Sequence, residues 1–173
     1  MNFLKTFLVT LAVYLGLNAL FVLIAVFTVS GFPAADALYI VAAIFAPISV
    51  FPGVAWTSSG IVGLITATDV VSVLVTFLGL IIPPIVALIL GARLGDNNQT
   101  GFGAWFTTAL VACGVYAILI GIGQGASIYL TLAWVDLILI YGELGSILAI
   151  FIGGIANGFF YGCISLLLAN KWI

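Results

Sequence analysis

Long apolar runs constrain this chain more strongly than any motif. Four runs exceed the ~20 residues that a helix needs to cross a bilayer, and Lys5 is the only charged residue within them. They span residues 4–29, 70–92, 102–122 and 144–169. Because backbone polar groups in lipid must bond within their own segment, each run is expected to be a helix. The sequence predicts an all-α polytopic integral membrane protein, with one transmembrane helical domain over residues 1–173.

The composition agrees with this class and excludes others. Hydrophobic residues make up 65% of the chain and charged residues 5%, against roughly 25% charged residues in soluble domains. The net charge is −2 without a basic patch, which argues against nucleic-acid binding. Histidine is absent, and Cys113 and Cys163 lie in apolar runs without a metal-ligand spacing. Neither a metal site nor a cofactor is expected.

Two shorter apolar segments leave the number of crossings open. Residues 34–51 include Pro47 near their end, and residues 125–141 include Asp136. Each segment is either a short tilted span or half of a re-entrant or interfacial hairpin. Burying their large side chains gains about 2 kcal/mol each, whereas Asp136 at depth costs about 2.5–3.5 kcal/mol. This balance favours six crossings over four.

The charged residues give two consistent topologies with both termini in the cytoplasm. In a four-span chain, one face carries every cation and the other carries four carboxylates: Lys5, Arg93 and Lys171 against Asp36, Asp69, Asp136 and Glu143. In a six-span chain the loop at residues 93–100 moves outside. Glycosylation of the sequon at Asn98 would require that second arrangement.

A polar residue within a row of glycines is the clearest packing signal. Asn157 lies among Gly154, Gly158 and Gly162, which are spaced four apart and allow a neighbouring helix to approach closely. Asn18 occupies the middle of the first run, so the two amides are expected either to hydrogen-bond each other or to line a polar cavity. The glycine row packs either against this chain's own helices or against another subunit.

Three residues form a candidate solute or ion site. Pro83 and Pro84 are expected to interrupt the second long run and to free the carbonyls of Gly79 and Leu80, as in the broken helices of transporters. Asp136 is the carboxylate most deeply embedded in apolar sequence, and an ionisable residue at membrane depth is a functional candidate.

Enzyme templates are absent, since the chain has no histidine, no Gly-x-Ser-x-Gly elbow and no phosphate-binding glycine loop. We therefore expect no enzymatic activity. The first hypothesis is a non-catalytic membrane protein that acts through helix–helix packing, as a subunit of a membrane complex or a homo-oligomer. The alternative is a small polytopic carrier or channel for an apolar or weakly polar solute. The expected partners are the lipid bilayer and other membrane subunits.

Overall fold

Four long helices form the frame of the molecule. The computed structural model describes residues 2–169, and all regular structure in this range is helical. The long helices are α1 (Phe3–Thr28), α5 (Val70–Leu94), α6 (Asn98–Gly123) and α7 (Ile128–Ala169). All four are long and apolar enough to cross a membrane, which confirms the predicted all-α class with four membrane-length helices.

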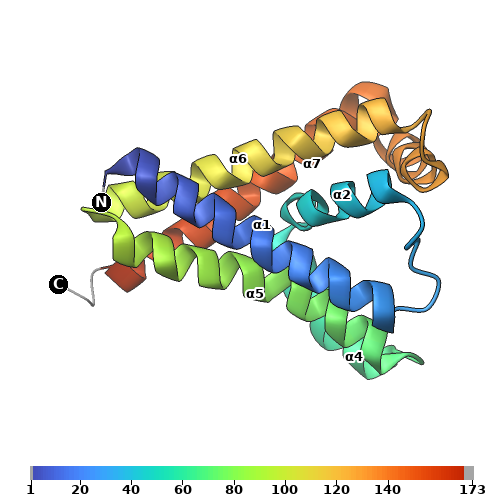
Figure 1. Cartoon of the computed structure of the whole chain (residues 1–173), viewed down its shortest axis with the longest axis horizontal. Helices are drawn as coiled ribbons and strands as arrows, with labels where there is room; N and C mark the ends of the chain where they lie inside the picture. The colour runs from blue at the N-terminus through green and yellow to red at the C-terminus, as the bar shows by residue number, and fades with distance from the viewer. Residues whose placement is uncertain (1, 170–173) are drawn as a thin grey trace.

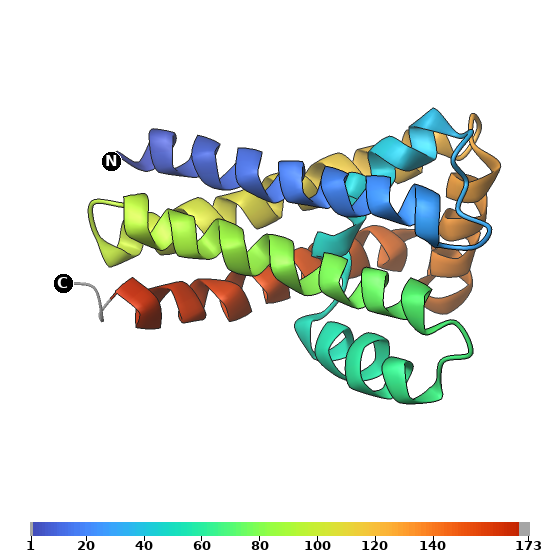
Figure 2. The ribbon, with the colours of Figure 1, turned by 60° about the horizontal axis from the view of Figure 1, so that its bottom comes forward.

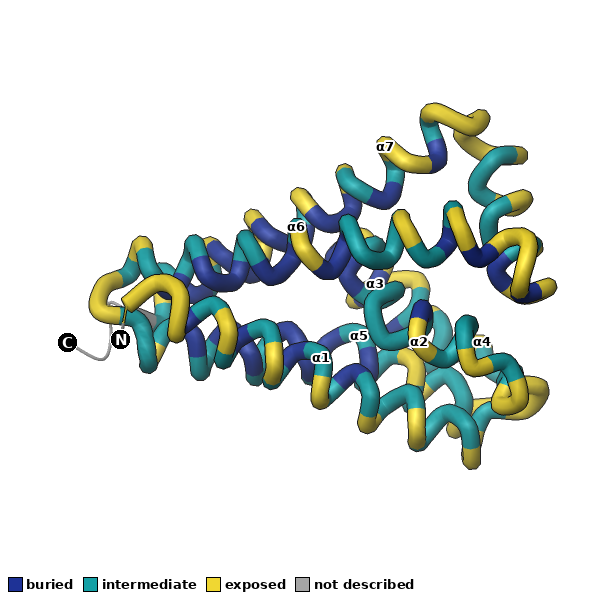
Figure 3. Tube along the Cα trace, turned by 45° about the horizontal axis from the view of Figure 1, so that its top comes forward, coloured by how far each residue is buried: buried dark blue, intermediate teal, exposed yellow. Residues whose placement is uncertain are grey.

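The long helices are arranged as two arms. One arm pairs α1 with α5 and the other pairs α6 with α7 (Figures 1 and 3). The arms converge where α1 begins and α7 ends, and they diverge at the opposite end. We call these the narrow end and the wide end.

A bent segment occupies the space between the diverging arms. It contains five short elements: α2 (Ala37–Phe45), the 3-10 turn η1 (Ala46–Ser49), α3 (Pro52–Trp56), the π-helical η2 (Thr57–Val62) and α4 (Gly63–Thr66). The helical direction changes by 101° between Ala37–Ser49 and Pro52–Thr66. Because α1 ends and α5 begins at the wide end, the segment enters and leaves there (Figure 2). We call residues 37–66 the hairpin and residues 46–51 its apex.

The second short apolar segment does not cross the bundle either. Gly142 adopts φ 72° and ψ 168°, which breaks α7 into two helical parts. Residues 128–141, the cross helix, lie across the wide end, and residues 143–169 return to the narrow end (Figure 2). The described residues thus hold four candidate spans, or five if the hairpin is one. The prediction of six crossings therefore exceeds the four or five candidate spans, because the hairpin enters and leaves at the wide end and residues 128–141 lie across that end.

The charged side chains separate along the bundle as the four-span topology predicts. Lys5 lies near the start of α1 and Arg93 near the end of α5, and both of these helix ends are at the narrow end (Figure 2). Four carboxylates belong to elements at the wide end: Asp36, Asp69, Asp136 and Glu143. Lys171 lies outside the described residues.

The distribution of polar and apolar residues around α1 is the reverse of that in a helix of a soluble protein. Its buried residues are all polar or phenolic and are spaced four apart: Thr6, Thr10, Tyr14 and Asn18. Apart from Lys5 near its start, its exposed large residues are apolar: Phe3, Leu4, Leu8, Leu20, Leu23 and Phe27. This pattern is typical of a helix whose outer side contacts lipid and whose polar groups bond within the bundle.

An aromatic cluster joins the two arms. The ring of Trp105 on α6 lies between Tyr14 on α1 and Tyr161 on α7, with centroid distances of 5.5 and 5.9 Å and edge-to-face geometry. All three side chains are buried. Such pairs contribute about 0.5–1.5 kcal/mol each beyond their buried area. The cluster therefore fixes the arms where the hairpin begins to separate them.

Candidate functional site

Asn157 on α7 binds the apex of the hairpin. Its Nδ2 atom donates to the carbonyl oxygens of Ile48 at 2.8 Å and Val50 at 2.5 Å, and also contacts the Gly153 carbonyl at 3.2 Å. The last carbonyls of a helix have no partner in that helix, and an unpaired carbonyl within a bilayer costs several kcal/mol. Asn157 thus supplies the donors that allow a backbone turn within the bundle.

Asn18 binds the same hairpin from the other arm. Its Nδ2 atom donates to the carbonyl oxygen of Ile44 at 2.9 Å. A hydrogen bond between the two asparagines was one of the two expected arrangements, and it does not form. Both instead hold backbone carbonyls of the hairpin, Asn18 near the end of α2 and Asn157 at the apex.

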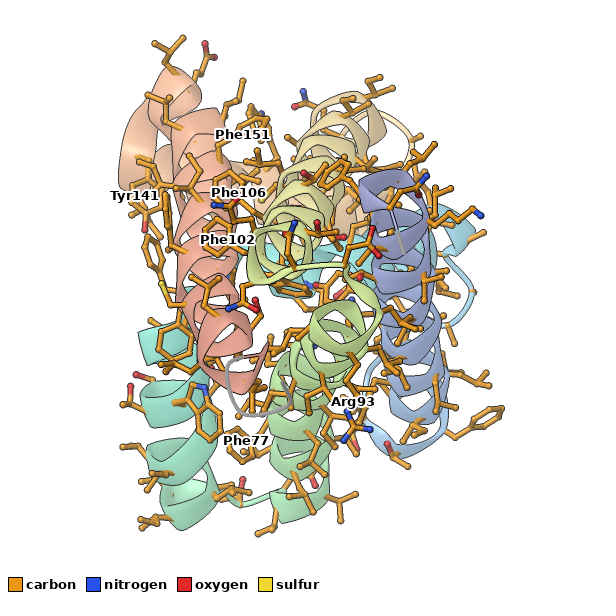
Figure 4. The ribbon with its side chains drawn as sticks, turned by 90° about the vertical axis from the view of Figure 1, so that its left-hand side faces the viewer. Phe77, Arg93, Phe102, Phe106, Tyr141 and Phe151 are labelled. Atoms are coloured by element: carbon orange, nitrogen blue, oxygen red, sulfur yellow. The ribbon has the colours of Figure 1, made fainter. Side chains whose placement is uncertain are left out.

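The glycine row of α7 packs against α6 of the same chain. A Cβ atom at Gly154 would lie 2.2 Å from the Cys113 sulfur, and one at Gly158 would lie 2.7 Å from the Phe106 ring. Gly162 has the same relation to Phe102, at 2.7 Å. Figure 4 shows Phe102 and Phe106 between α6 and α7. This row is therefore occupied within the chain.

Gly153, one position before the row, makes the closest approach to the hairpin. A Cβ atom there would lie 2.0 Å from the Ser49 carbonyl oxygen and 2.8 Å from its carbonyl carbon. The neighbour here is backbone and cannot rotate away. The absence of a side chain at Gly153 thus allows the apex to reach Asn157.

A cavity of about 420 Å³ lies beside the apex. Its walls come from the apex, α6, the cross helix and the second part of α7, and most of its lining residues are apolar. Its polar residues are Ser49, Tyr116, Asp136 and Tyr141. We call this space the apex cavity.

Two smaller cavities continue around the apex. One of about 270 Å³ shares Ser49, Val50, Tyr116 and Ala133 with the apex cavity. The other, of about 150 Å³, contains Asn18 in its wall. The apex is therefore bordered by cavities from the cross helix to α1.

Asp136 lies in the wall of the apex cavity, on the cross helix. Its side chain is exposed rather than embedded between helices. Its carboxylate accepts no hydrogen bond and forms no ion pair with the described residues. The site prediction made for Asp136 thus coincides with a cavity, although at the wide end of the bundle and not at its centre.

The prolines of α5 lie one helical turn after two residues that line the smallest of the three cavities. The helix α5 continues through Pro83 and Pro84, which are both buried, so the predicted interruption does not occur. Gly79 and Leu80, whose carbonyls lose their usual donors to these prolines, line the cavity that contains Asn18. The buried Oδ1 atom of Asn18 accepts no hydrogen bond from the described residues. A buried acceptor oxygen without a donor therefore belongs to a residue in the wall of this cavity.

No family model, curated protein or solved structure matches this chain. Among the described residues no group of three or more acidic, cysteine or histidine side chains is arranged to hold a metal ion. The features of the chain that bear on function are therefore its cavities, their polar groups and the distribution of charge.

A hydrogen bond between two loops fastens the wide end. The Ser127 hydroxyl donates to the Asp36 carboxylate at 2.5 Å, and Asp36 also caps α2 by accepting from the Tyr39 backbone N–H at 2.9 Å. These bonds hold the pKa of Asp36 below its usual value, with Ser127 making the larger contribution. The connection before α2 is thereby fixed to the start of the cross helix. The contact between Ser127 and Asp36 was missed from the sequence, because no motif around either residue links the two positions.

Proposed function

We propose that this chain is a small multi-pass membrane carrier that binds an apolar or weakly polar solute in the apex cavity. The observation that carries the proposal is the cavity of about 420 Å³ beside a backbone turn held within the bundle. Apolar cavities with a few convergent polar groups are the usual form of small-molecule sites. Tyr116, Ser49 and Asp136 are such groups.

The hairpin supports the same proposal. Irregular backbone within a membrane bundle is tolerated where it is buried in protein or lines a cavity, and broken helices form the binding sites of many transporters. Here Asn18 and Asn157 bind the turn from opposite arms, and residues of the turn form one wall of the cavity. The apex is thus preorganised for a solute.

A neutral aromatic alcohol, naphthylmethanol, tests this proposal. We expect purified protein in mild detergent to bind it saturably at one site in equilibrium dialysis. Ala133→Phe should abolish saturable binding, because Ala133 lines both the apex cavity and the adjoining one. Ala12→Phe, on the exposed face of α1, is the matched control. Equal, non-saturable uptake by all three proteins would contradict the proposal.

We further propose that the narrow end faces the cytoplasm. Lys5 and Arg93 are carried by elements at this end, and cytoplasmic loops are enriched in cations. In a chain without its native cysteines, Ala35→Cys should react with an impermeant maleimide on intact cells. Gln99→Cys should react only after permeabilisation, and Asn98 should carry no glycan. The reverse labelling pattern would show that the wide end, and not the narrow end, faces the cytoplasm.

A second candidate function, as a subunit of a membrane assembly, is favoured by a different row of small residues. A Cβ atom at Gly114 or Gly121 on α6 would meet nothing within 4 Å. These glycines lie two helical turns apart on one side of α6, which leaves a shallow strip for another helix. Such a partner would bind α6 and not the glycine row of α7.

The mass of the detergent-solubilised particle tests this second function. We expect Gly121→Leu to reduce the mass measured by light scattering to that of one chain. Gly158→Leu should instead destabilise the single chain, because Gly158 contacts Phe106 of the same chain. If the wild-type protein is already monomeric, or Gly121→Leu retains the larger mass, the strip on α6 is not an interface.

A further inference from the structure

We infer that the solute of the apex cavity is an apolar organic cation, such as a protonated aromatic amine, whose ammonium group binds the Asp136 carboxylate. This inference rests on the proposed solute site and adds the sign of the charge that the site selects. Its basis is an unpaired carboxylate in the wall of a mostly apolar cavity.

Asp136 is available to a ligand. No described side chain donates to its carboxylate or neutralises it. The residues around it in the cavity wall include Leu137 and Ile140 of the same helix. A cation bound in the cavity would contact both the carboxylate and the apolar wall, and the exclusion of water by this wall would strengthen their attraction.

The whole wide end carries charge of one sign. Among the described residues, the side-chain cations are Lys5 and Arg93, which belong to elements at the narrow end, whereas Asp36, Asp69, Asp136 and Glu143 belong to elements at the wide end. Hydrogen bonds from Ser127 and Ser72 hold the pKa values of Asp36 and Asp69 below their usual range, so both stay ionised at neutral pH. This end therefore attracts cations and repels anions.

The remaining lining suits the apolar body of such a solute. Phe51, Tyr116 and Tyr141 contribute aromatic rings to the cavity wall. Aromatic faces attract ammonium groups as well as apolar surfaces. The helix α3, which begins at Pro52, also reaches the cavity through Val54. Its N-terminus would repel a cation, but with at most about half a positive charge. The carboxylates outweigh that contribution.

Three probes of the same shape test the charge preference. Naphthylmethylammonium, naphthylmethanol and naphthoate carry a positive charge, no charge and a negative charge on one aromatic body. In equilibrium dialysis we expect the wild-type protein to bind the cation about tenfold more tightly than the alcohol, as expected for a partly shielded ion pair. Naphthoate should bind more weakly than either.

Variants of Asp136 locate the effect. Asp136→Asn should remove the preference for the cation, and Asp136→Glu should restore most of it, which a purely structural role would not explain. If the alcohol or naphthoate binds the wild-type protein as tightly as the cation, and Ala133→Phe blocks that binding, the charge inference fails while the solute site stands. If no probe binds in a way that Ala133→Phe blocks, both fail.

Discussion

Replacement of Asn157 by leucine is expected to lower the unfolding temperature more than any other single polar substitution in the bundle. Leucine has nearly the same size but donates no hydrogen bond, so the carbonyls of Ile48 and Val50 lose their donor. Each unsatisfied buried carbonyl costs about 1–3 kcal/mol. For a chain of this size the two together correspond to a decrease of about 4–24 °C.

The two cysteines provide the measurement. Cys113 is buried and Cys163 is exposed, so in a Cys163→Ser background a thiol-reactive dye reports unfolding through Cys113 alone. Asn18→Leu removes a single bond to the Ile44 carbonyl and should give a smaller decrease. Gln99→Leu, at an exposed position near the start of α6, serves as the control. If Asn157→Leu melts together with Gln99→Leu, then Asn157 does not hold the apex.

The same substitution should also weaken solute binding. Ser49 and Val50 line the apex cavity, and Asn157 fixes the position of this turn. A protein that is still folded but lacks this bond should therefore bind the neutral naphthyl alcohol less tightly below its unfolding temperature. This coupling would connect the stability of the hairpin to the proposed function.

The class of fold follows from the sequence, but the course of the short segments does not. Long uncharged runs leave a helix as the only economical structure in lipid, so the four long helices were predictable. The hairpin was not predictable, because burying the apolar side chains of residues 37–66 is favourable whether the segment crosses the bilayer or turns back. The hydrogen-bond donors that other helices offer to the turn decide between these courses. These donors, Asn18 and Asn157, are distant from the apex in sequence.

The predicted site residues were informative in different degrees. The sequence singles out Asn157 and Asn18 as polar groups within apolar runs, but their partners are backbone carbonyls, which no side-chain pattern shows. The four-residue spacing of Thr6, Thr10, Tyr14 and Asn18 would have identified the inner face of α1, because polar groups in a membrane helix turn toward the bundle. Gly153 could not be separated from its neighbours, since every glycine in the run has the same chemistry.

Alanine at Gly153 is expected to be as disruptive as the loss of Asn157, although it adds only one methyl group. That methyl group would lie 2.0 Å from the Ser49 carbonyl oxygen, so the apex must move by about an ångström or more to reach an ordinary contact distance. Ser49 lies between the two residues whose carbonyls Asn157 binds, and the movement would strain both bonds. Overpacking of this kind typically costs about 1–3 kcal/mol.

A graded series of glycine-to-alanine variants separates this contact from general helix effects. Alanine favours a helix over glycine by about 1 kcal/mol, so Gly114→Ala, which meets nothing within 4 Å, should melt at or above the parent temperature. Gly158→Ala should cause an intermediate decrease, because the Phe106 ring that it meets is a side chain and can shift. Gly153→Ala should melt lowest, since only there is the neighbour backbone that Asn157 holds in place. If Gly153→Ala instead melts with Gly114→Ala, the hairpin apex does not rest on α7, and the wall of the apex cavity is formed in another way.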